Sequence, residues 1–132
     1  MNRKLLERFV PKNQLIVMID NLKGEEGGYF KEALAKTEKM ILDTPELYST
    51  EELGDSAPIR LHYFYGGIDI YITELDRESG EMFGFACLNG DRFAAELGYF
   101  DSESIVASPL MNLDLHMDEG VTIGDIKKSF AG

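Results

Sequence analysis

The sequence predicts an α+β fold in which a single domain of 132 residues combines helices with an antiparallel sheet. Apolar residues recur at helical spacing through most of residues 1–56. In residues 58–132, apolar and polar residues alternate in runs that end at glycine-bearing turns, a pattern typical of strands joined as a meander. We therefore expect a mainly helical portion, followed by a sheet of four to five strands with short helices.

Two short helices are expected first. Residues 5–10 are amphipathic and are followed by Pro11, which interrupts a helix. Residues 15–22 repeat apolar side chains at helical spacing after Asn13, a residue type that caps helices well. The apolar run 15–19 could also form a buried strand, so that alternative stays open beside the helix.

A longer helix is predicted over residues 29–42, because apolar side chains gather on one helical face and charged side chains on the other. Thr44 and Pro45 then have the chemistry of an N-cap and a first helical position, which predicts another helix start. Residues 54–58 combine glycine, serine and proline and are expected to connect this portion to the sheet.

The sheet prediction depends on four runs of strand-like sequence. Gly66 and Gly67 can adopt the positive backbone angles of a tight hairpin turn between the first two runs. The third run is apolar nearly throughout, as in a strand that is covered on both faces. Residues 92–95, just before the fourth run, are also compatible with a helical turn. The four runs are residues 59–65, 68–73, 82–88 and 96–100.

Three further elements are expected near the carboxyl end. Asp101 or Ser102 can cap a short helix. Residues 113–117 alternate apolar and polar side chains, which predicts a strand with one face in water. Thr122 and Asp125 have the spacing of a capping box and predict a terminal helix.

The net charge of −11 is concentrated in the second half of the chain. Residues 1–66 carry 9 basic and 11 acidic side chains, a net of −2, whereas residues 67–132 carry 4 and 13, a net of −9. An acidic surface repels phosphate backbones and anionic lipids, so we expect no direct nucleic-acid binding and no membrane binding. Solubility alone is the favoured explanation of this net charge, and if the charge serves a partner, another protein with a basic surface is the best match.

Cysteine usage and hydropathy predict a cytoplasmic location. Cys87 is the only cysteine, and its apolar surroundings favour a buried, inert thiol over a nucleophile. The amino terminus is positively charged but lacks the unbroken apolar core of a signal peptide. The sequence contains no stretch close to the roughly 20 apolar residues that span a bilayer.

The chain resembles an uncharacterised bacterial family, the domain of unknown function numbered 2958 (DUF2958). The resemblance lies in the order of three motifs, which are followed by a helix that starts at an acidic or hydroxyl residue. The resemblance covers residues 58–126 well and 13–23 loosely. It implies an antiparallel sheet after a short helical portion, in a small protein carried on plasmids, phages and other mobile elements. It implies no catalytic residues. The motifs are Thr-Glu-Leu-Asp at 73–76, Met-Phe-Gly-Phe at 82–85 and Glu-Leu-Gly-Tyr-Phe at 96–100.

Two features depart from that family. Residues 24–56 form an insertion relative to its short members, which changes the exposed surface. After Pro109 the chain lacks the connection rich in glycine, leucine and proline that the resemblance implies, and it has Met111 and Asn112 there instead.

Asp114, His116 and Asp118 form the most distinctive polar pattern. On one strand face they would place an imidazole between two carboxylates, which could hold a divalent metal or orient a general base. Side chains two apart on a strand are about 7 Å apart at Cα, and metal sites usually recruit ligands from several elements, so a solvated strand face is favoured. The other histidine, His62, is expected at a half-exposed polar position of the first strand.

Glu74 and Glu96 lie within the motif segments and could converge if their strands are neighbours. Paired carboxylates can perform acid and base chemistry when a concave pocket holds them. Because the chain has 24 acidic residues, an accidental pair is the favoured interpretation.

Gly98 is expected to allow a close backbone approach or a bulge. Its neighbours Tyr99 and Phe100 point to opposite faces of a strand, so we expect one in the core and the other exposed, where it could anchor a partner. Glu96 and Asp101 are expected on the negative surface.

The function predicted from these observations is a non-enzymatic protein-interaction module, one version of which blocks a basic nucleic-acid-binding surface. The sequence has no glycine-rich phosphate loop, nucleophile elbow or paired-cysteine motif, so we predict no cofactor and no metal. The alternative is a small-ligand-binding or metal-binding protein, or a hydrolytic enzyme, that uses a sheet face around His62, Glu74, Glu96 and His116.

Overall fold

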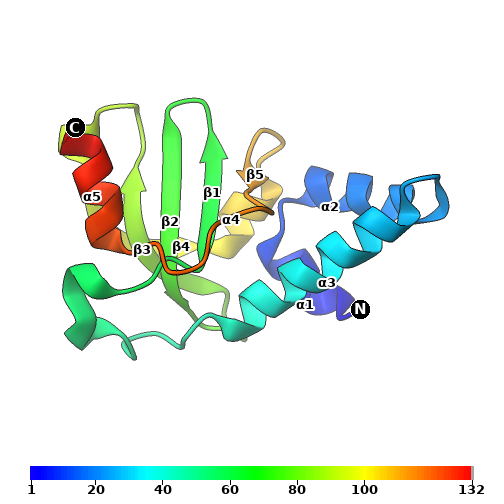
Figure 1. The fold of residues 1–132 in the computed structure, drawn as a ribbon, viewed down its shortest axis with the longest axis horizontal. Helices are drawn as coiled ribbons and strands as arrows, with labels where there is room; N and C mark the ends of the chain where they lie inside the picture. Colours follow the sequence, from blue (N-terminus) through cyan, green and yellow to red (C-terminus); the bar gives the residue numbers. More distant parts are fainter. Residues whose placement is uncertain (132) are drawn as a thin grey trace.

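The strands form an antiparallel meander at the centre of the molecule (Figure 1). The computed structural model describes residues 1–131, and within them the sheet has five strands in the order β4-β3-β2-β1-β5. The predicted α+β class and sheet are therefore confirmed. The strands are β1 (Leu61–Tyr65), β2 (Ile68–Leu75), β3 (Glu81–Cys87), β4 (Glu96–Asp101) and β5 (Asn112–Leu113).

Helices cover the two faces of the sheet unequally (Figure 1). The amino-terminal helices lie on one side, whereas the terminal helix lies on the other, so that the two chain ends are on opposite sides of the sheet. The α-helices are α1 (Arg3–Phe9), α2 (Lys12–Asp20), α3 (Gly27–Asp43), α4 (Ser102–Ala107) and α5 (Ile123–Ala131). The 3-10 turns are η1 (Asn21–Lys23), η2 (Glu51–Ser56) and η3 (Arg92–Ala94).

The larger core fills the space between the sheet and α1 to α4. It joins alternate residues of β1 and β2 to the apolar faces of these helices, and Tyr63 at its centre is fully buried. The Tyr63 hydroxyl donates to the Phe9 carbonyl, so its one polar group is paired. Burial raises the pKa of this phenol far above its usual range. We call this side of the sheet the core face.

A smaller apolar cluster lies on the opposite side, which we call the outer face. Phe85 of β3 packs there against Ala57, Ile59 and Ile123, with α5 lying over them. This cluster covers part of the outer face, so the two faces differ in exposure.

One extra residue in β2 changes which side chains reach each face. Ile72 pairs with Gly84, but the next pair is Glu74 with Phe83, which leaves Thr73 as a bulge. A strand alternates faces with a period of two, so a one-residue bulge reverses the alternation after it. Leu75 thereby enters the core, and Glu74 turns to the outer face.

The bulge depends on a glycine in the neighbouring strand. A Cβ atom on Gly84 would lie 2.0 Å from the Tyr71 carbonyl oxygen and 2.9 Å from the Ile72 Cα. Gly98, opposite it in β4, has only the Phe100 ring at 3.9 Å from such an atom. The sequence-based expectation of a bulge or close approach at Gly98 was therefore wrong. The close approach occurs at Gly84 in β3, and the bulge occurs at Thr73 in β2.

The helical portion agrees with the prediction except at two caps. Residues 15–19 are helical, and α2 begins earlier than predicted, with Pro11 at the N-cap in place of Asn13. Thr44 ends α3 and starts no helix: its N–H donates to the Ile41 carbonyl and its hydroxyl to the Met40 carbonyl. A threonine hydroxyl can cap either end of a helix, so the residue type alone does not decide between them.

The predicted strand over residues 113–117 is wrong beyond its first residue. β5 stops at Leu113, because the Asp114 carboxylate accepts the His116 N–H and closes a turn. The Gln14 side chain also occupies the free edge of β5, accepting from the Leu113 N–H and donating to the Leu113 carbonyl. The alternating apolar and polar residues after Leu113 therefore form a turn and not a strand.

The two predicted helix starts near the carboxyl end are confirmed. The Asp101 carboxylate accepts the Glu103 N–H at the start of α4. Thr122 and Asp125 exchange hydrogen bonds between side chain and backbone, as a capping box requires. Within residues 1–131, helices that combine the length and the apolar character needed to cross a bilayer are absent.

We predict that Gly84→Ala destabilises the fold by more than about 2 kcal/mol, since the new methyl group meets backbone that carries the bulge. Gly98→Ala is the matched control and should change the free energy of unfolding by less than about 1 kcal/mol. Urea unfolding followed by circular dichroism measures both. Equal stability of the two variants would contradict the close approach at Gly84.

Candidate functional site

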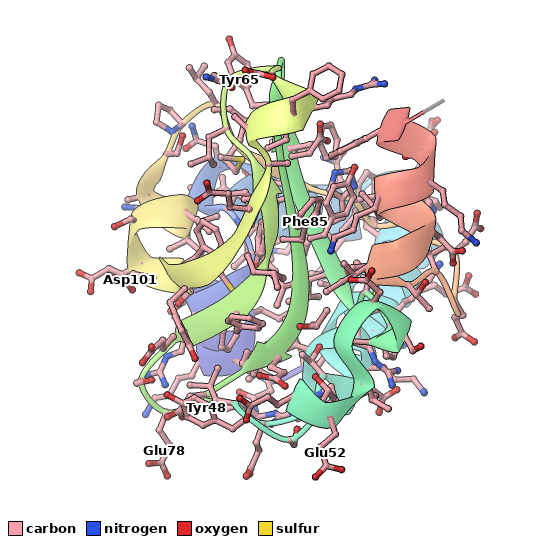
Figure 2. All side chains as sticks on the ribbon, turned by 90° about the vertical axis from the view of Figure 1, so that its left-hand side faces the viewer. Tyr48, Glu52, Tyr65, Glu78, Phe85 and Asp101 are labelled. Carbon is pink, nitrogen blue, oxygen red and sulfur yellow. The ribbon has the colours of Figure 1, made fainter. Side chains whose placement is uncertain are left out.

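The free edge of β4 is the largest unpaired feature of the sheet. Within the described residues β4 pairs only with β3, whereas Gln14 covers the opposite edge at β5. In Figure 2 β4 faces the viewer, with α4 on one side and α5 on the other and no helix in front of it. An uncovered edge strand can accept another strand.

The register shows which backbone groups of β4 are free. The Ser102 N–H donates to the Gly80 carbonyl, and these two residues form the position next to the Glu81–Asp101 pair. Gly80 and Ser102 are therefore a hydrogen-bonded pair. Antiparallel pairs alternate between bonded and non-bonded, which makes the Gly84–Gly98 pair bonded. The N–H and C=O groups of Leu97 and Tyr99 therefore point away from β3, toward the free edge.

Apolar side chains remain exposed beside this edge. Leu97 and Tyr99 are each 50% exposed, and Phe93 in the preceding η3 turn is 99% exposed. Phe100, on the core face, is half-buried and packs against the main core. As expected from the sequence, Tyr99 and Phe100 point to opposite faces, and Phe100 packs against the core whereas Tyr99 is exposed.

Two hollows flank Leu97 on the outer face, and the first contains the Glu74 carboxylate. This acidic hollow has a volume of about 300 Å³ and is lined by Tyr48, Glu74, Phe83, Leu97 and Tyr99, among others. The Phe83 and Tyr99 ring centroids are 4.9 Å apart, and those of Tyr48 and Tyr99 are 6.3 Å apart. Three aromatic rings thus stand close to one buried acid.

Glu74 is 3% exposed and is held by donors from one short turn. Its Oε1 accepts the Tyr48 N–H at 2.8 Å, and its Oε2 accepts both the Thr50 N–H at 2.7 Å and the Thr50 hydroxyl. Tyr48 has a φ of 71°, an uncommon angle for a residue with a side chain. The carboxylate therefore stabilises a turn that the backbone alone disfavours.

The second hollow combines aromatic rings with two cations. This basic hollow, of about 460 Å³, is lined by Phe85, Arg92, Phe93, Lys127 and Phe130, among others. The Arg92 guanidinium lies 5.2 Å from the Phe130 ring centroid, and the Lys127 ammonium lies 5.7 Å from that of Phe85. Both distances suit cation–π attraction. Glu96, exposed at the start of β4, also borders this hollow and lies apart from Glu74.

His62 belongs to a separate polar group near β5. Its Nε2 lies 2.8 Å from Asp69 Oδ1, and its Nδ1 lies 3.6 Å from Asp114 Oδ2. The ring stacks on Tyr71 with centroids 4.4 Å apart. Burial is the main cause that raises the pKa of Tyr71 to about 12. This group ties β1, β2 and the turn after β5 together.

The other predicted residues lie elsewhere. His116 is exposed and its Nε2 is 3.1 Å from the Tyr29 hydroxyl, while Asp118 is exposed in the loop before α5. Asp101 is occupied as the N-cap of α4. Asp114, His116 and Asp118 do not share a strand face, because β5 ends before them. Across residues 1–131, groups of three or more potential metal ligands in a suitable arrangement are absent.

Sequence reasoning identified His62, Glu74 and Tyr99 but missed the residues around them. Tyr48 comes from the turn after α3, and only the tertiary structure places it beside β4. Asp69 could have been found, because the Gly66–Gly67 hairpin sets a register in which His62 faces Tyr71, next to Asp69. Phe83 lies beside Glu74 because of the bulge, and the sequence signal of the bulge is the change of phase between Ile72 and Leu75.

The fold and the edge define a class: an α+β domain with an open antiparallel sheet whose free edge strand carries exposed apolar side chains. Comparison of the sequence with family models and with curated proteins, and of the fold with solved structures, finds no match.

Backbone hydrogen exchange should alternate along β4. We predict protected amides at Gly98 and Phe100, which donate to β3, and rapid exchange at Leu97 and Tyr99, which face the free edge. Amide exchange followed residue by residue by NMR measures this. Uniform protection across the four amides would mean that the edge is already paired in solution.

We predict that Glu74→Gln lowers the free energy of unfolding by about 2 kcal/mol, since it replaces charge-assisted hydrogen bonds between a buried carboxylate and two part-buried N–H groups. The matched control is Glu96→Gln at an exposed position, with an expected change below about 0.5 kcal/mol. Denaturant unfolding of both variants provides the test. A neutral Glu74→Gln would show that the turn at Tyr48 does not depend on this carboxylate.

Proposed function

We propose that this protein is a non-enzymatic interaction module that binds an extended segment of a partner protein along the free edge of β4. The observation that carries the proposal is the combination of outward backbone groups and exposed side chains at Leu97 and Tyr99. An added strand would satisfy those N–H and C=O groups, and its alternate side chains would enter the acidic and basic hollows.

The charge of the chain supports a partner with a basic surface. The second half, which supplies β2 to β5, has a net charge of −9, and Glu81 and Asp101 lie opposite each other at one end of the edge. A second copy of this chain carries the same net charge of −11, so repulsion disfavours pairing between copies. Electrostatic attraction would instead speed the encounter with a basic protein.

A protein that grips nucleic acid has the required basic surface. In this proposal carboxylates of the module occupy positions where phosphates would bind, so the partner is blocked, and the module itself does not bind nucleic acid. We place this activity in the cytoplasm and the chain among proteins similar to the DUF2958 family, on the basis of the three motifs at residues 73–76, 82–85 and 96–100.

The alternative of a ligand-binding or hydrolytic site has less support. His62, Glu74, Glu96 and His116 have different partners and do not line a common hollow. A catalytic pair needs its groups to converge on one reacting atom.

Substitution of Leu97 tests the proposal. Leu97→Pro removes an outward N–H without removing a bond to β3, whereas Leu97→Val keeps the N–H and an apolar side chain. We predict that peptides selected from a displayed random library against the native protein bind Leu97→Val with little change and lose at least about tenfold affinity for Leu97→Pro. Isothermal titration calorimetry measures the affinity, and circular dichroism checks that both variants fold.

The position of the bound peptide provides the second readout. Binding should slow amide exchange at Leu97 and Tyr99, since an added strand pairs with those groups. Selected peptides that bind Leu97→Pro as tightly as Leu97→Val, or that leave these amides unprotected, would overturn edge binding.

A further inference from the structure

We infer that the acidic hollow is a binding site for a cationic side chain, a lysine ammonium or an arginine guanidinium, of the partner segment. The inference rests on the proposed function, because it identifies the chemistry of one residue in the segment that β4 would bind. Three aromatic rings beside a buried carboxylate, next to outward backbone groups, are the juxtaposition that carries it.

The rings supply the first part of the recognition. Tyr48, Phe83 and Tyr99 come from three different segments and line one hollow of about 300 Å³. The face of an aromatic ring is electronegative and attracts a cation within about 6 Å of its centroid. Phe83 and Tyr99 are tilted at 55° and Tyr48 and Tyr99 at 51°, so the rings are not stacked flat on one another.

The Glu74 carboxylate supplies the second part. Its three hydrogen bonds come from backbone N–H groups and a hydroxyl, and within residues 1–131 it forms no ion pair. A carboxylate offers about four acceptor positions, and Oε1 uses only one. A cation that enters the hollow could therefore pair with the remaining acceptor position of this carboxylate.

The hollow also lies where an added strand would place a side chain. Leu97 and Tyr99 point their backbone groups to the free edge and line the hollow with their side chains. Alternate residues of an added strand face the outer face at intervals of about 7 Å. One of them would stand beside Tyr99, and its long side chain could reach over the rings.

The charge of the hollow discriminates against other side chains. An acidic side chain would be repelled by Glu74, and a neutral apolar one would leave the remaining acceptor position unpaired. The basic hollow on the other side of Leu97 differs in charge, because Arg92 and Lys127 border it together with Glu96, and Lys127 is paired with Asp55. The acidic hollow is therefore the one that favours a cationic side chain.

Two sets of probes test the site. The first is tetramethylammonium chloride, compared at constant ionic strength with sodium chloride and with tert-butanol, a neutral molecule of similar size. The second is the peptide acetyl-Thr-Val-Lys-Val-Thr-amide, compared with peptides that carry glutamate or norleucine at the central position. Amide signals of Tyr48, Phe83 and Tyr99 are followed by NMR during each titration.

We predict saturable shifts of these signals with tetramethylammonium and with the lysine peptide, and weaker binding of the other probes. Tyr99→Leu should weaken the binding of both cations roughly three- to tenfold, because it keeps an apolar side chain and removes a ring. Tyr65→Leu is the matched control: Tyr65 is also an exposed tyrosine but lies at the end of the molecule far from Tyr48 (Figure 2). This control should bind as the native protein does.

The outcomes separate this site from the edge itself. If all three peptides bind equally and Leu97→Pro abolishes their binding, the edge stands and the cation site is overturned. If tetramethylammonium shifts the three signals and no peptide protects the Leu97 and Tyr99 amides, the cation site stands and edge binding fails. Equal shifts with tetramethylammonium and tert-butanol, or no shift with either cation, would overturn the cation site.

Discussion

The close approach of β2 to Gly84 is the constraint on which the rest of the structure depends. Only a residue without a Cβ atom leaves room for the Tyr71 carbonyl and the Ile72 Cα at that point, and the bulge at Thr73 follows directly after it. The bulge reverses the alternation of β2, so that Leu75 fills the core and Glu74 reaches the outer face. Without it, the same alternation would direct a carboxylate into the apolar core, where an unpaired charge is costly.

The redirected carboxylate organises the chain beyond the sheet. By accepting the Tyr48 and Thr50 N–H groups it holds a turn in which Tyr48 has a positive φ, and this turn brings a third aromatic ring to β4. The two edges of the sheet differ in whether their outward backbone groups have hydrogen-bond partners. Gln14 satisfies the backbone of Leu113 at one edge, whereas the outward groups of Leu97 and Tyr99 at the other edge are left to solvent or to a partner.

Much of the fold could be predicted from the sequence, and the candidate site could be predicted only in part. Helical spacing predicted α1 to α3, and alternation and glycine-bearing turns predicted β1 to β4, because these signals act within a few residues. The errors lie where a residue type suits two local structures. Thr44 can end a helix as well as begin one, and Asp114 closes a turn in a segment that alternates like a strand. Glu74 and Tyr99 were identified, but their neighbours on the outer face were not.

The sequence by itself determined the α+β class, the order of the main strands, the caps at Asp101 and Thr122, and the concentration of negative charge in the second half. These properties follow from composition and from contacts between residues close in the chain. Only the tertiary structure decided that Glu74 is buried beside three rings, that Asp114 approaches His62, and that β4 is the open edge. Each of these depends on a bulge, a strand register or a contact between distant segments, and packing sets all three.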